Sequence, residues 1–515
     1  MLLSVYLIGF IVVNSGINNI EMRQRFEQQY KLGITPISEV KFPLDCRHQL
    51  PAVLKALQYI FVTPELSAGI FNLLEEKICS GKKKTGRTGM DLWHILVLGV
   101  VRHAHNDDWD RVHYDSNYNI NVRQVLGVHA EHGGIEFIEF KRQTIVDNAS
   151  LIDAGLLSEI NMLVALHGHN LLKKKDAPLA LKTDSFAVET NVHFPTDLNL
   201  LWDSSRKCMD KVMDLKKIAP VKDWREIKSF YKKYKSLFRS TSYMVFRGKN
   251  ELKKKEEVKD YLILSLDLKD RCEAIINTPP FVAGFENKIA SIILELRHYC
   301  TYVSKFCDQI ERRLIKGEVI AAEEKVYSIF EPHTEWLTKG KLNKKVELGV
   351  LVMVTTEQNH FIVDYKVMEK QRDQAQVKGL LERIKNNYPG VAIASHSFDK
   401  GYYSKENFKI LTEQTDKAVM PKKGKLTVAD KTRESDEAFK TIRNKHSAVE
   451  SNINMLEHHG LNRCMDKGIK GFRRYVGLSV LAYNLHILGN HLMEEEKEKQ
   501  ELLRLQRERY HRQAA

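Results

Sequence analysis

The sequence predicts a mixed α/β core that is interrupted by a large helical block and preceded by an all-α region. Three patterns carry this prediction. Apolar and polar residues alternate over 178–189, and Val- and Ile-rich segments over 345–368 flank a turn-like Glu-Gln-Asn, as in β-strands. Over 205–320, apolar residues recur at steps of three and four, as along a helix. Residues 41–170 hold apolar helical segments separated by short polar breaks.

The composition favours a globular protein with a polyanionic partner. The 515 residues include 43% hydrophobic and 28% charged residues, which excludes a fibrous or largely disordered chain. Lys plus Arg outnumber Asp plus Glu by 80 to 66, and this basic balance points weakly to nucleic acid. The seven cysteines are scattered without a Cys-x-x-Cys pair. We therefore expect neither a disulfide framework nor a structural zinc site, and we expect a reducing cytosol.

Residues 1–40 form an N-terminal leader. Its apolar run, 1–13, is shorter than the roughly 17–25 residues of a membrane-spanning helix, and no Lys or Arg precedes it as in a signal peptide. We expect no stable membrane association. Two interpretations of residues 1–21 stay open: translation starts at Met22, or the segment is a real buried or membrane-touching element.

Residues 41–170 are predicted to form a helical domain. The segment Met90–Val101 is apolar nearly all round, as a buried helix would be. Compact helical domains of this kind often bind DNA, and a helical packing module is as consistent with the pattern alone.

The block 205–320 is predicted to be a long antiparallel helical hairpin or a small bundle. Residues 205–259 contain 18 Lys or Arg against 7 Asp or Glu, a net charge of +11. The aromatic residues follow the apolar seam, so we assign them to the core rather than to base stacking. Lys232, Lys233 and Lys235 lie off that seam and are candidates for phosphate contacts, with a merely solvated surface as the alternative.

The C-terminal half of the chain alternates strands and helices. Residues 171–204 and 321–490 together form the predicted core domain. The order is hairpin 345–368, helix 370–387, strand 391–395, helix from Ser404, strand 417–420, helix 432–458 ended by Gly460, and helix 472–490. The charged tail 491–515 is predicted to be an exposed helix or a frayed end.

Three acids occupy informative positions in this order. Asp184 lies in the middle of the first strand, Asp399 follows the strand 391–395, and Glu450 lies on the helix 432–458. Groups at adjacent strand ends converge, and a helix packed across them supplies a third. Three carboxylates would suit two Mg²⁺ ions, which prefer oxygen ligands and catalyse phosphodiester displacement.

Two alternatives concern the helix acid. By helix geometry alone, an ion pair of Glu450 with a basic neighbour such as Arg443 or His446 is favoured over a metal ligand. Glu457 lies two turns further on the same side, about 10.5 Å along the axis, so Glu450 and Glu457 cannot both reach one metal pair. Because Glu450 adjoins the apolar Val449, we predict that Glu450 is the third acid.

Three blocks carry a resemblance to a known family. They read LKTDSFAVETNVHFPTD, SHSFDKGYY and KHSAVESNINMLEHHGLNRC, and they resemble the catalytic blocks of bacterial insertion-sequence transposases, most closely the ISNCY-type group. The segments RTGMDLWHILVLGVVRHAHN and FEPHTEWLTKGKLNKKVELG are similar to that group as well. The resemblance covers the chain from Met22 to about Asn490.

The resemblance implies an RNase H-like DDE core with the helical block inserted after its first strand. Asp184, Asp399 and Glu450 would be the catalytic triad and would bind Mg²⁺, for which Mn²⁺ would substitute. The N-terminal domain would bind the terminal inverted repeats of the element. The enzyme would cleave the element ends and join the 3′-hydroxyl to target DNA, with Arg443 and His446 contacting DNA or water near the metals.

The resemblance also implies a homodimer or higher oligomer on double-stranded DNA, in the nucleoid-associated cytoplasm of a bacterium. Two alternatives remain: a nuclease of the same fold that cuts without joining, and a non-catalytic DNA-binding protein descended from a transposase. The intact triad speaks against the second alternative.

Overall fold

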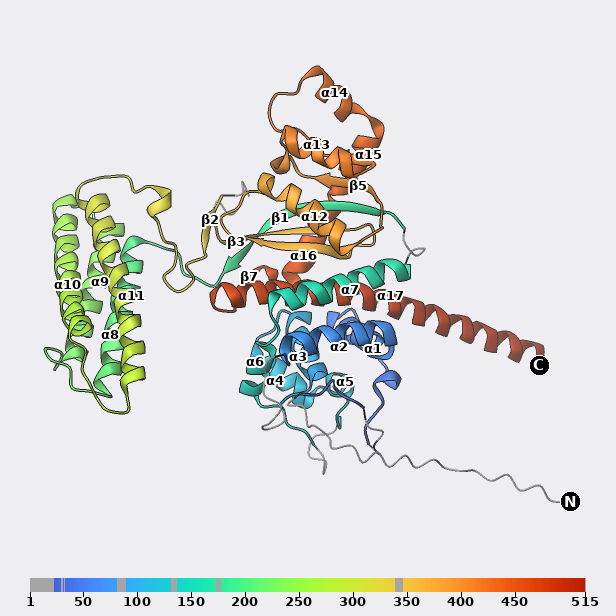
Figure 1. Cartoon of the computed structure of the whole chain (residues 1–515), viewed down its shortest axis with the longest axis horizontal. Helices are drawn as coiled ribbons and strands as arrows, with labels where there is room; N and C mark the ends of the chain where they lie inside the picture. Colours follow the sequence, from blue (N-terminus) through green and yellow to red (C-terminus); the bar gives the residue numbers. More distant parts are fainter. Residues whose placement is uncertain are drawn as a thin grey trace.

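The computed structural model describes residues 23–28, 31, 33–80, 89–130, 137–172, 177–338 and 346–514. The predicted start at Met22 and the alternatives for 1–21 lie outside these residues. Within them, the chain forms a seven-stranded mixed sheet with helices around it, an N-terminal helical region, and a helical bundle to one side (Figure 1).

The sheet is built around its longest strand. The strands are β1 (Leu179–Thr190), β2 (Glu335–Leu337), β3 (Glu347–Thr356), β4 (Ile362–Met368), β5 (Ile393–Phe398), β6 (Lys417–Val419) and β7 (Arg463–Cys464). β1 pairs with β3 in antiparallel and with β5 in parallel orientation. β4 extends the antiparallel side and β6 the parallel side. The mixed sheet predicted from the alternating segments is confirmed.

One strand differs from its predicted position. β5 begins at Ile393 instead of residue 391 and continues to Phe398. Gly390 adopts a φ of +82° in the preceding turn, and the Val391 N–H donates to the Tyr388 carbonyl, so this residue still belongs to the turn. As a result, Asp399 follows the strand directly.

The seven N-terminal helices share a core with the sheet. They are α1 (Gln49–Val62), α2 (Pro64–Ile78), α3 (Leu92–Ala104), α4 (Trp109–Tyr118), α5 (Ile120–Val125), α6 (Arg142–Ala149) and α7 (Ala154–Leu172). Every residue of α3 is buried, which confirms the predicted buried helix. One continuous hydrophobic core runs from Leu96 of α3 through Leu481 to Leu181 of β1.

The helix α17 (Gly468–Ala514) joins these two parts. Together with α7 it lies between the sheet and the other N-terminal helices (Figure 1). Its closest crossing is with α1, at Gly489. A methyl group added to Gly489 would lie 1.8 Å from the Ala52 carbonyl oxygen, so only glycine permits this approach. The predicted charged tail is the exposed end of α17, in agreement with the helical alternative.

The helical block is a four-helix bundle with its own core. Its helices are α8 (Asp197–Lys216), α9 (Ile227–Arg247), α10 (Glu251–Asn277) and α11 (Glu286–Ile310). Tyr234 is fully buried, and Phe238 stacks on Trp202 at 5.2 Å, so the aromatic seam is core as predicted. The bundle begins at Asp197, eight residues before the predicted 205, because Thr196 caps α8.

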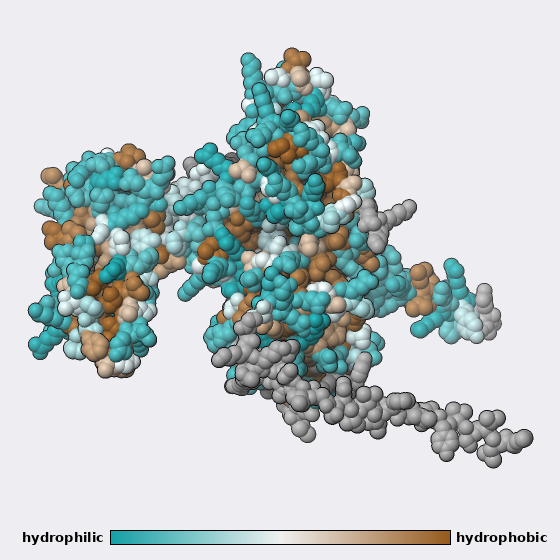
Figure 2. Space-filling view, viewed as in Figure 1, coloured by the Kyte–Doolittle hydropathy of each residue, from teal (hydrophilic) through white to brown (hydrophobic). Residues whose placement is uncertain are grey.

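The two ends of this block meet. The hydroxyl groups of Thr190, at the end of β1, and Thr334, before β2, are 2.8 Å apart. In Figure 2 the surface of the bundle is mostly hydrophilic, with scattered hydrophobic residues between.

The predicted single helix 432–458 is divided. It consists of α14 (Val428–Ser435), α15 (Glu437–His446) and α16 (Ala448–Leu456), followed by a π-turn over Glu457–Leu461. Asp436 leaves the helical conformation with ψ 138° and caps α15 by accepting a hydrogen bond from the Phe439 N–H. Gly460, with a φ of +107°, ends the segment as predicted.

The remaining helices are α12 (Val377–Asn387) and α13 (Lys405–Gln414), and the Ser404 side chain caps α13 as predicted. Of all the helices in the described ranges, none alone is long and apolar enough to cross a membrane. Helices α6 and α7, which meet at a bend of 81°, pass that test only as a pair, by length and composition.

Candidate active site

Asp184 and Asp399 lie side by side at the junction of two parallel strands. Thr183 of β1 pairs with Phe398 of β5, and the next residue on each chain is the aspartate. Paired residues of neighbouring strands point to the same face of a sheet. Both carboxylates therefore belong to one face, as the strand-end argument predicted.

Helices α15 and α16 cover that face. His446, at the end of α15, places its Nδ1 atom 2.9 Å from the Ser397 hydroxyl of β5. Leu456, at the end of α16, packs in the cluster that contains Val188 of β1. The two helices thus follow β1 from Asp184 towards its carboxyl end, and Glu450, in the first turn of α16, lies between these two contacts along the chain.

The three carboxylates have a donor environment that fits hard cations. Asp184 is half-buried, and its Oδ1 accepts the Ser185 N–H at 2.7 Å. Asp399 and Glu450 are exposed, and in the described part of the chain neither carboxylate takes part in a hydrogen bond or ion pair. The ion pair of Glu450 with Arg443 or His446, favoured from helix geometry, does not form. His446 instead contacts Ser397.

The three acids are less tightly clustered than a single-ion site requires. Among the described residues, Asp184, Asp399 and Glu450 do not form a group whose ligand atoms all lie within 4.8 Å of one another.

The electrostatics around the acids involve two basic neighbours. Burial lowers the pKa of His446, against the opposing effect of Asp399, so its imidazole is neutral at pH 7. Burial also lowers the pKa of Lys182, which shares the face of Asp184. Lys182, Ser397, Lys445 and Ser451 line a pocket of about 500 Å³ beside the site. Lys182 precedes Asp184 by two residues, and strand alternation alone would have found it.

A fourth carboxylate, that of Asp373, lies near Tyr402, the residue that follows Asp399 by three positions. Burial and the nearby carboxylates of Asp373, Asp184 and Asp399 raise the pKa of the Tyr402 hydroxyl. Asp373 lies in a short 3-10 turn before α12, and its buried Oδ1 has no hydrogen-bond partner in the described structure. No strand pattern marks this residue, so the sequence reasoning missed it.

The other predicted DNA contacts lie apart from this site. Arg443 is exposed on α15. Lys232 and Lys233 are exposed and Lys235 is half-buried on α9, in the bundle to the side of the sheet (Figure 1). The structure therefore does not bring the three lysines together with the three acids.

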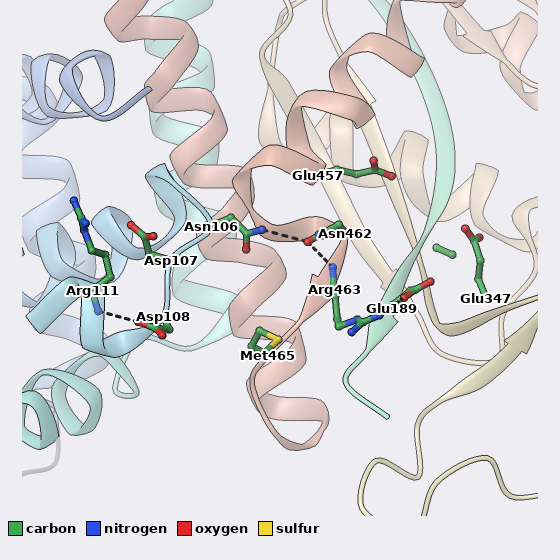
Figure 3. A pocket seen from close by; sticks show the side chains of 11 residues that line it. Asn106, Asp107, Asp108, Arg111, Glu189, Glu347, Glu457, Asn462, Arg463 and Met465 are labelled. Atoms are coloured by element: carbon green, nitrogen blue, oxygen red, sulfur yellow. Dashed lines mark hydrogen bonds and ion pairs between the residues drawn. The ribbon is translucent and has the colours of Figure 1, made fainter. Parts of the chain in front are cut away.

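A second, wider pocket lies elsewhere, between the N-terminal helices and the far end of β1 (Figure 3). It has a volume of about 820 Å³, and its lining includes five acids: Asp107, Asp108, Glu189, Glu347 and Glu457. Arg463 forms an ion pair with Glu189 at 3.2 Å. Because so many carboxylates repel phosphate, this pocket is poorly suited to DNA. Glu457 belongs here and not with Asp184.

One family model matches the chain. Residues 317–485 match the model described as "Transposase DDE domain". The match includes Asp399 and Glu450 and ends within α17, whereas Asp184, the bundle and the N-terminal helices lie outside it. It relates this part of the chain to the DDE domains of transposases, the proteins that move mobile elements. No curated protein and no solved structure matched the chain.

Proposed function

We propose that the chain is a DNA transposase of the ISNCY type, which binds the terminal inverted repeats of an insertion sequence, cleaves at the element ends and joins the 3′-hydroxyl to target DNA. One observation carries this proposal. Asp184 and Asp399 are neighbours on parallel strands beneath the helix that bears Glu450. The match to a transposase DDE domain over 317–485 is consistent with it.

The strand order supports an RNase H-like core. The central β1 has an antiparallel hairpin, β3 and β4, on one side and the parallel strands β5 and β6 on the other. The four-helix bundle is inserted between β1 and the hairpin, as the resemblance implies. In this arrangement the first two acids come from the middle of β1 and the end of β5.

Asp184, Asp399 and Glu450 would hold Mg²⁺, or Mn²⁺ in its place, because three carboxylates are the oxygen ligands that hard cations prefer. When bound, two such ions activate the attacking oxygen and stabilise the leaving one. Lys182 would attract the phosphate beside the acids. The neutral His446, anchored to Ser397, would hold α15 against β5 and keep Glu450 in place.

The remaining surfaces would bind the rest of the DNA. Arg443 faces solvent on α15, and Lys232, Lys233 and Lys235 give the bundle a basic edge. The N-terminal helices would recognise the inverted repeats. We further propose a homodimer or higher oligomer on DNA, working in the bacterial cytoplasm with the nucleoid.

The test uses four variants of the full chain: Asp184→Asn, Asp399→Asn, Glu450→Gln and, as the matched control, Glu457→Gln. The first three remove a metal ligand at constant size. We expect cleavage and joining of labelled element ends to fall by more than the roughly 10–100-fold typical of lost outer-shell partners, in Mg²⁺ and in Mn²⁺. Binding of the ends should persist, and Glu457→Gln should retain activity.

Three outcomes would contradict the proposal. Substantial activity of an aspartate variant would remove that residue from the triad. Loss with Glu457→Gln and retention with Glu450→Gln would move the site towards the acidic pocket. Cleavage without any joined product from the unmodified protein would favour the nuclease, and binding without cleavage would favour the non-catalytic descendant.

A further inference from the structure

Three cysteines from three different helices converge in the core of the bundle. Cys208 comes from α8, Cys272 from α10 and Cys300 from α11. Their exposed fractions are 0%, 0% and 4%. All three sulfur atoms lie within 4.8 Å of one another, and those of Cys208 and Cys300 are 3.8 Å apart.

The spacing matches a metal site. A disulfide would require about 2.05 Å between the sulfurs, and all three cysteines are free. Zn²⁺ binds thiolates at about 2.3 Å in tetrahedral geometry, which places two sulfur ligands about 3.8 Å from each other. The Cys208–Cys300 separation already has this value.

We propose that Cys208, Cys272 and Cys300 form a three-thiolate site for one Zn²⁺ ion. Among the described residues, no fourth His, Cys, Asp or Glu belongs to the group, so water or an external ligand completes the tetrahedron. Soft thiolates select zinc over the hard Mg²⁺ proposed for the carboxylates. The two sites therefore differ in chemistry as well as in place, and the zinc site does not rest on the proposed reaction.

The site was missed because cysteine spacing was considered along the chain only. A Cys-x-x-Cys search detects ligands on one turn, whereas here each ligand comes from a different helix. The residues are 64 and 28 positions apart along the sequence. Only the folding of α8, α10 and α11 against one another brings them together.

Zinc binding at this site would involve the thiolate form. Because Zn²⁺ binds the deprotonated sulfur of cysteine, its affinity for the three thiols should decrease as the pH decreases.

Zinc at this position would tie α8 to the helix pair α10–α11. The three helices meet in the core that supports α9, the helix with Lys232 and Lys233. A zinc ion that binds the folded bundle but not the unfolded chain stabilises the folded bundle by mass action. If zinc binds here, the rigidity of the lysine-bearing surface of α9 depends on the ion.

The experiment titrates the full chain, freed of metal and fully reduced, with Zn²⁺ alone. We expect one tightly bound ion per chain and, with Co²⁺ as a probe, the near-ultraviolet absorption of thiolate–cobalt bonds. Cys208→Ser, Cys272→Ser and Cys300→Ser should each weaken Zn²⁺ binding at least 100-fold. The matched control is Cys307→Ser, since Cys307 is also buried on α11 but stands outside the trio.

Two results would overturn the site. One is an unmodified protein that binds no Zn²⁺ and shows no thiolate–cobalt absorption. The other is a loss of binding with Cys307→Ser as large as that with the trio variants. The Zn²⁺ stoichiometry and the cobalt spectrum are measured on the unmodified chain, so they decide the matter even where a serine variant fails to fold.

Discussion

The bundle and the N-terminal helices are both all-α, but they are attached to the sheet in different ways. The bundle encloses a core of its own, and its ends are joined by the Thr190–Thr334 hydrogen bond. The N-terminal helices have no separate core. Their apolar residues belong to the same cluster as Leu181 of β1 and Leu481 of α17. The bundle is a separate inserted module. The N-terminal helices, in contrast, form one body with the sheet and α17, and this body carries the three acids.

This difference separates two kinds of contribution to stability. Loss of the four bundle helices removes apolar contacts mainly within the core of the bundle. Loss of the N-terminal helices would expose one apolar side of α17. Because α17 covers the sheet, the packing of the sheet would be weakened as well. The four predictions below test this contrast, beginning with the effect that we expect to be greatest.

The greatest effect is expected from excision of each region. Replacing residues 191–333 by a short Gly/Ser loop should leave a folded remainder, because the hydroxyls at the two ends are only 2.8 Å apart and, of the contacts with α17, it removes the Glu331–Gly468 hydrogen bond and the packing of His333 on Phe472. Deleting residues 41–170 should prevent folding, because it exposes the apolar contacts of α17. Circular dichroism and thermal unfolding of both proteins measure this. A folded protein without residues 41–170 would refute the shared core.

The second prediction concerns the crossing of α1 and α17. Gly489→Ala places a methyl group against the Ala52 carbonyl oxygen, and we expect a loss of about 3 kcal/mol or more in the free energy of unfolding of the body. The control is Gly379→Ala in α12, where the added methyl meets only the end of the Arg383 side chain at 3.7 Å. Helix propensity should make the control stabilising by about 0.5–1 kcal/mol. Equal effects of the two substitutions would contradict the tight crossing.

The third prediction concerns pH. The Nδ1–H of His459 donates to the His103 carbonyl oxygen at 2.8 Å, and its Nε2 lies 3.1 Å from Nδ1 of His486, between α3 and α17. Burial lowers the pKa of His459 to about 3 and that of His486 to about 4. Below the unfolded value of about 6.5, the unfolded chain binds more protons than the folded one, so stability falls as the pH decreases.

The slope should be about 1.4 kcal/mol per pH unit for each histidine that titrates only on unfolding, between about pH 6.5 and pH 4. Urea unfolding across this range measures it for the body. His298→Gln is the control, because His298 is the one histidine in residues 197–315 and is exposed. His459→Gln should flatten the dependence more than this control does. An unaltered slope in His459→Gln would rule out this histidine as its source.

The smallest effect is expected from the lysines of the bundle. Neutralising Lys232, Lys233 and Lys235 to Gln should reduce the slope of log K against log salt for DNA binding by up to about 2.7, at roughly 0.9 per phosphate contact. Lys497 and Lys499, exposed on the outer part of α17, provide the control. Fluorescence anisotropy at several salt concentrations measures both. An unchanged slope would assign the three lysines to a solvated surface.

Periodicity and local signals predicted those parts of the fold that depend on one segment at a time. The alternation around Asp184 located β1, the three–four steps located the helices of the bundle, and Ser404 and Gly460 marked a helix start and an end. The break at Asp436 was not predicted, because the apolar stripe of the predicted helix 432–458 continues past this residue. Only the backbone conformation reveals that Asp436 is a helix cap.

Features that join distant segments were beyond such reasoning. The pairing of Thr183 with Phe398 could be expected from strand ends, but the approach of Asp373 through Tyr402 could not. The three cysteines, on three helices, have no signature along the chain. The predicted helical domain and the predicted core domain share one core, and this depends on which faces of α17 are covered. The sequence of α17 is apolar on several sides, so it does not indicate which partner covers which face.

The length of α17 has a mechanical consequence. At about 1.5 Å per residue, its 47 residues span about 70 Å without a break. A continuous helix resists bending, so the N-terminal helices and the sheet that it joins cannot turn independently of each other. If the N-terminal helices bind the end of the element, α17 fixes the distance between the bound sequence and the phosphate that reaches the acids. This distance would not depend on the orientation of the bundle.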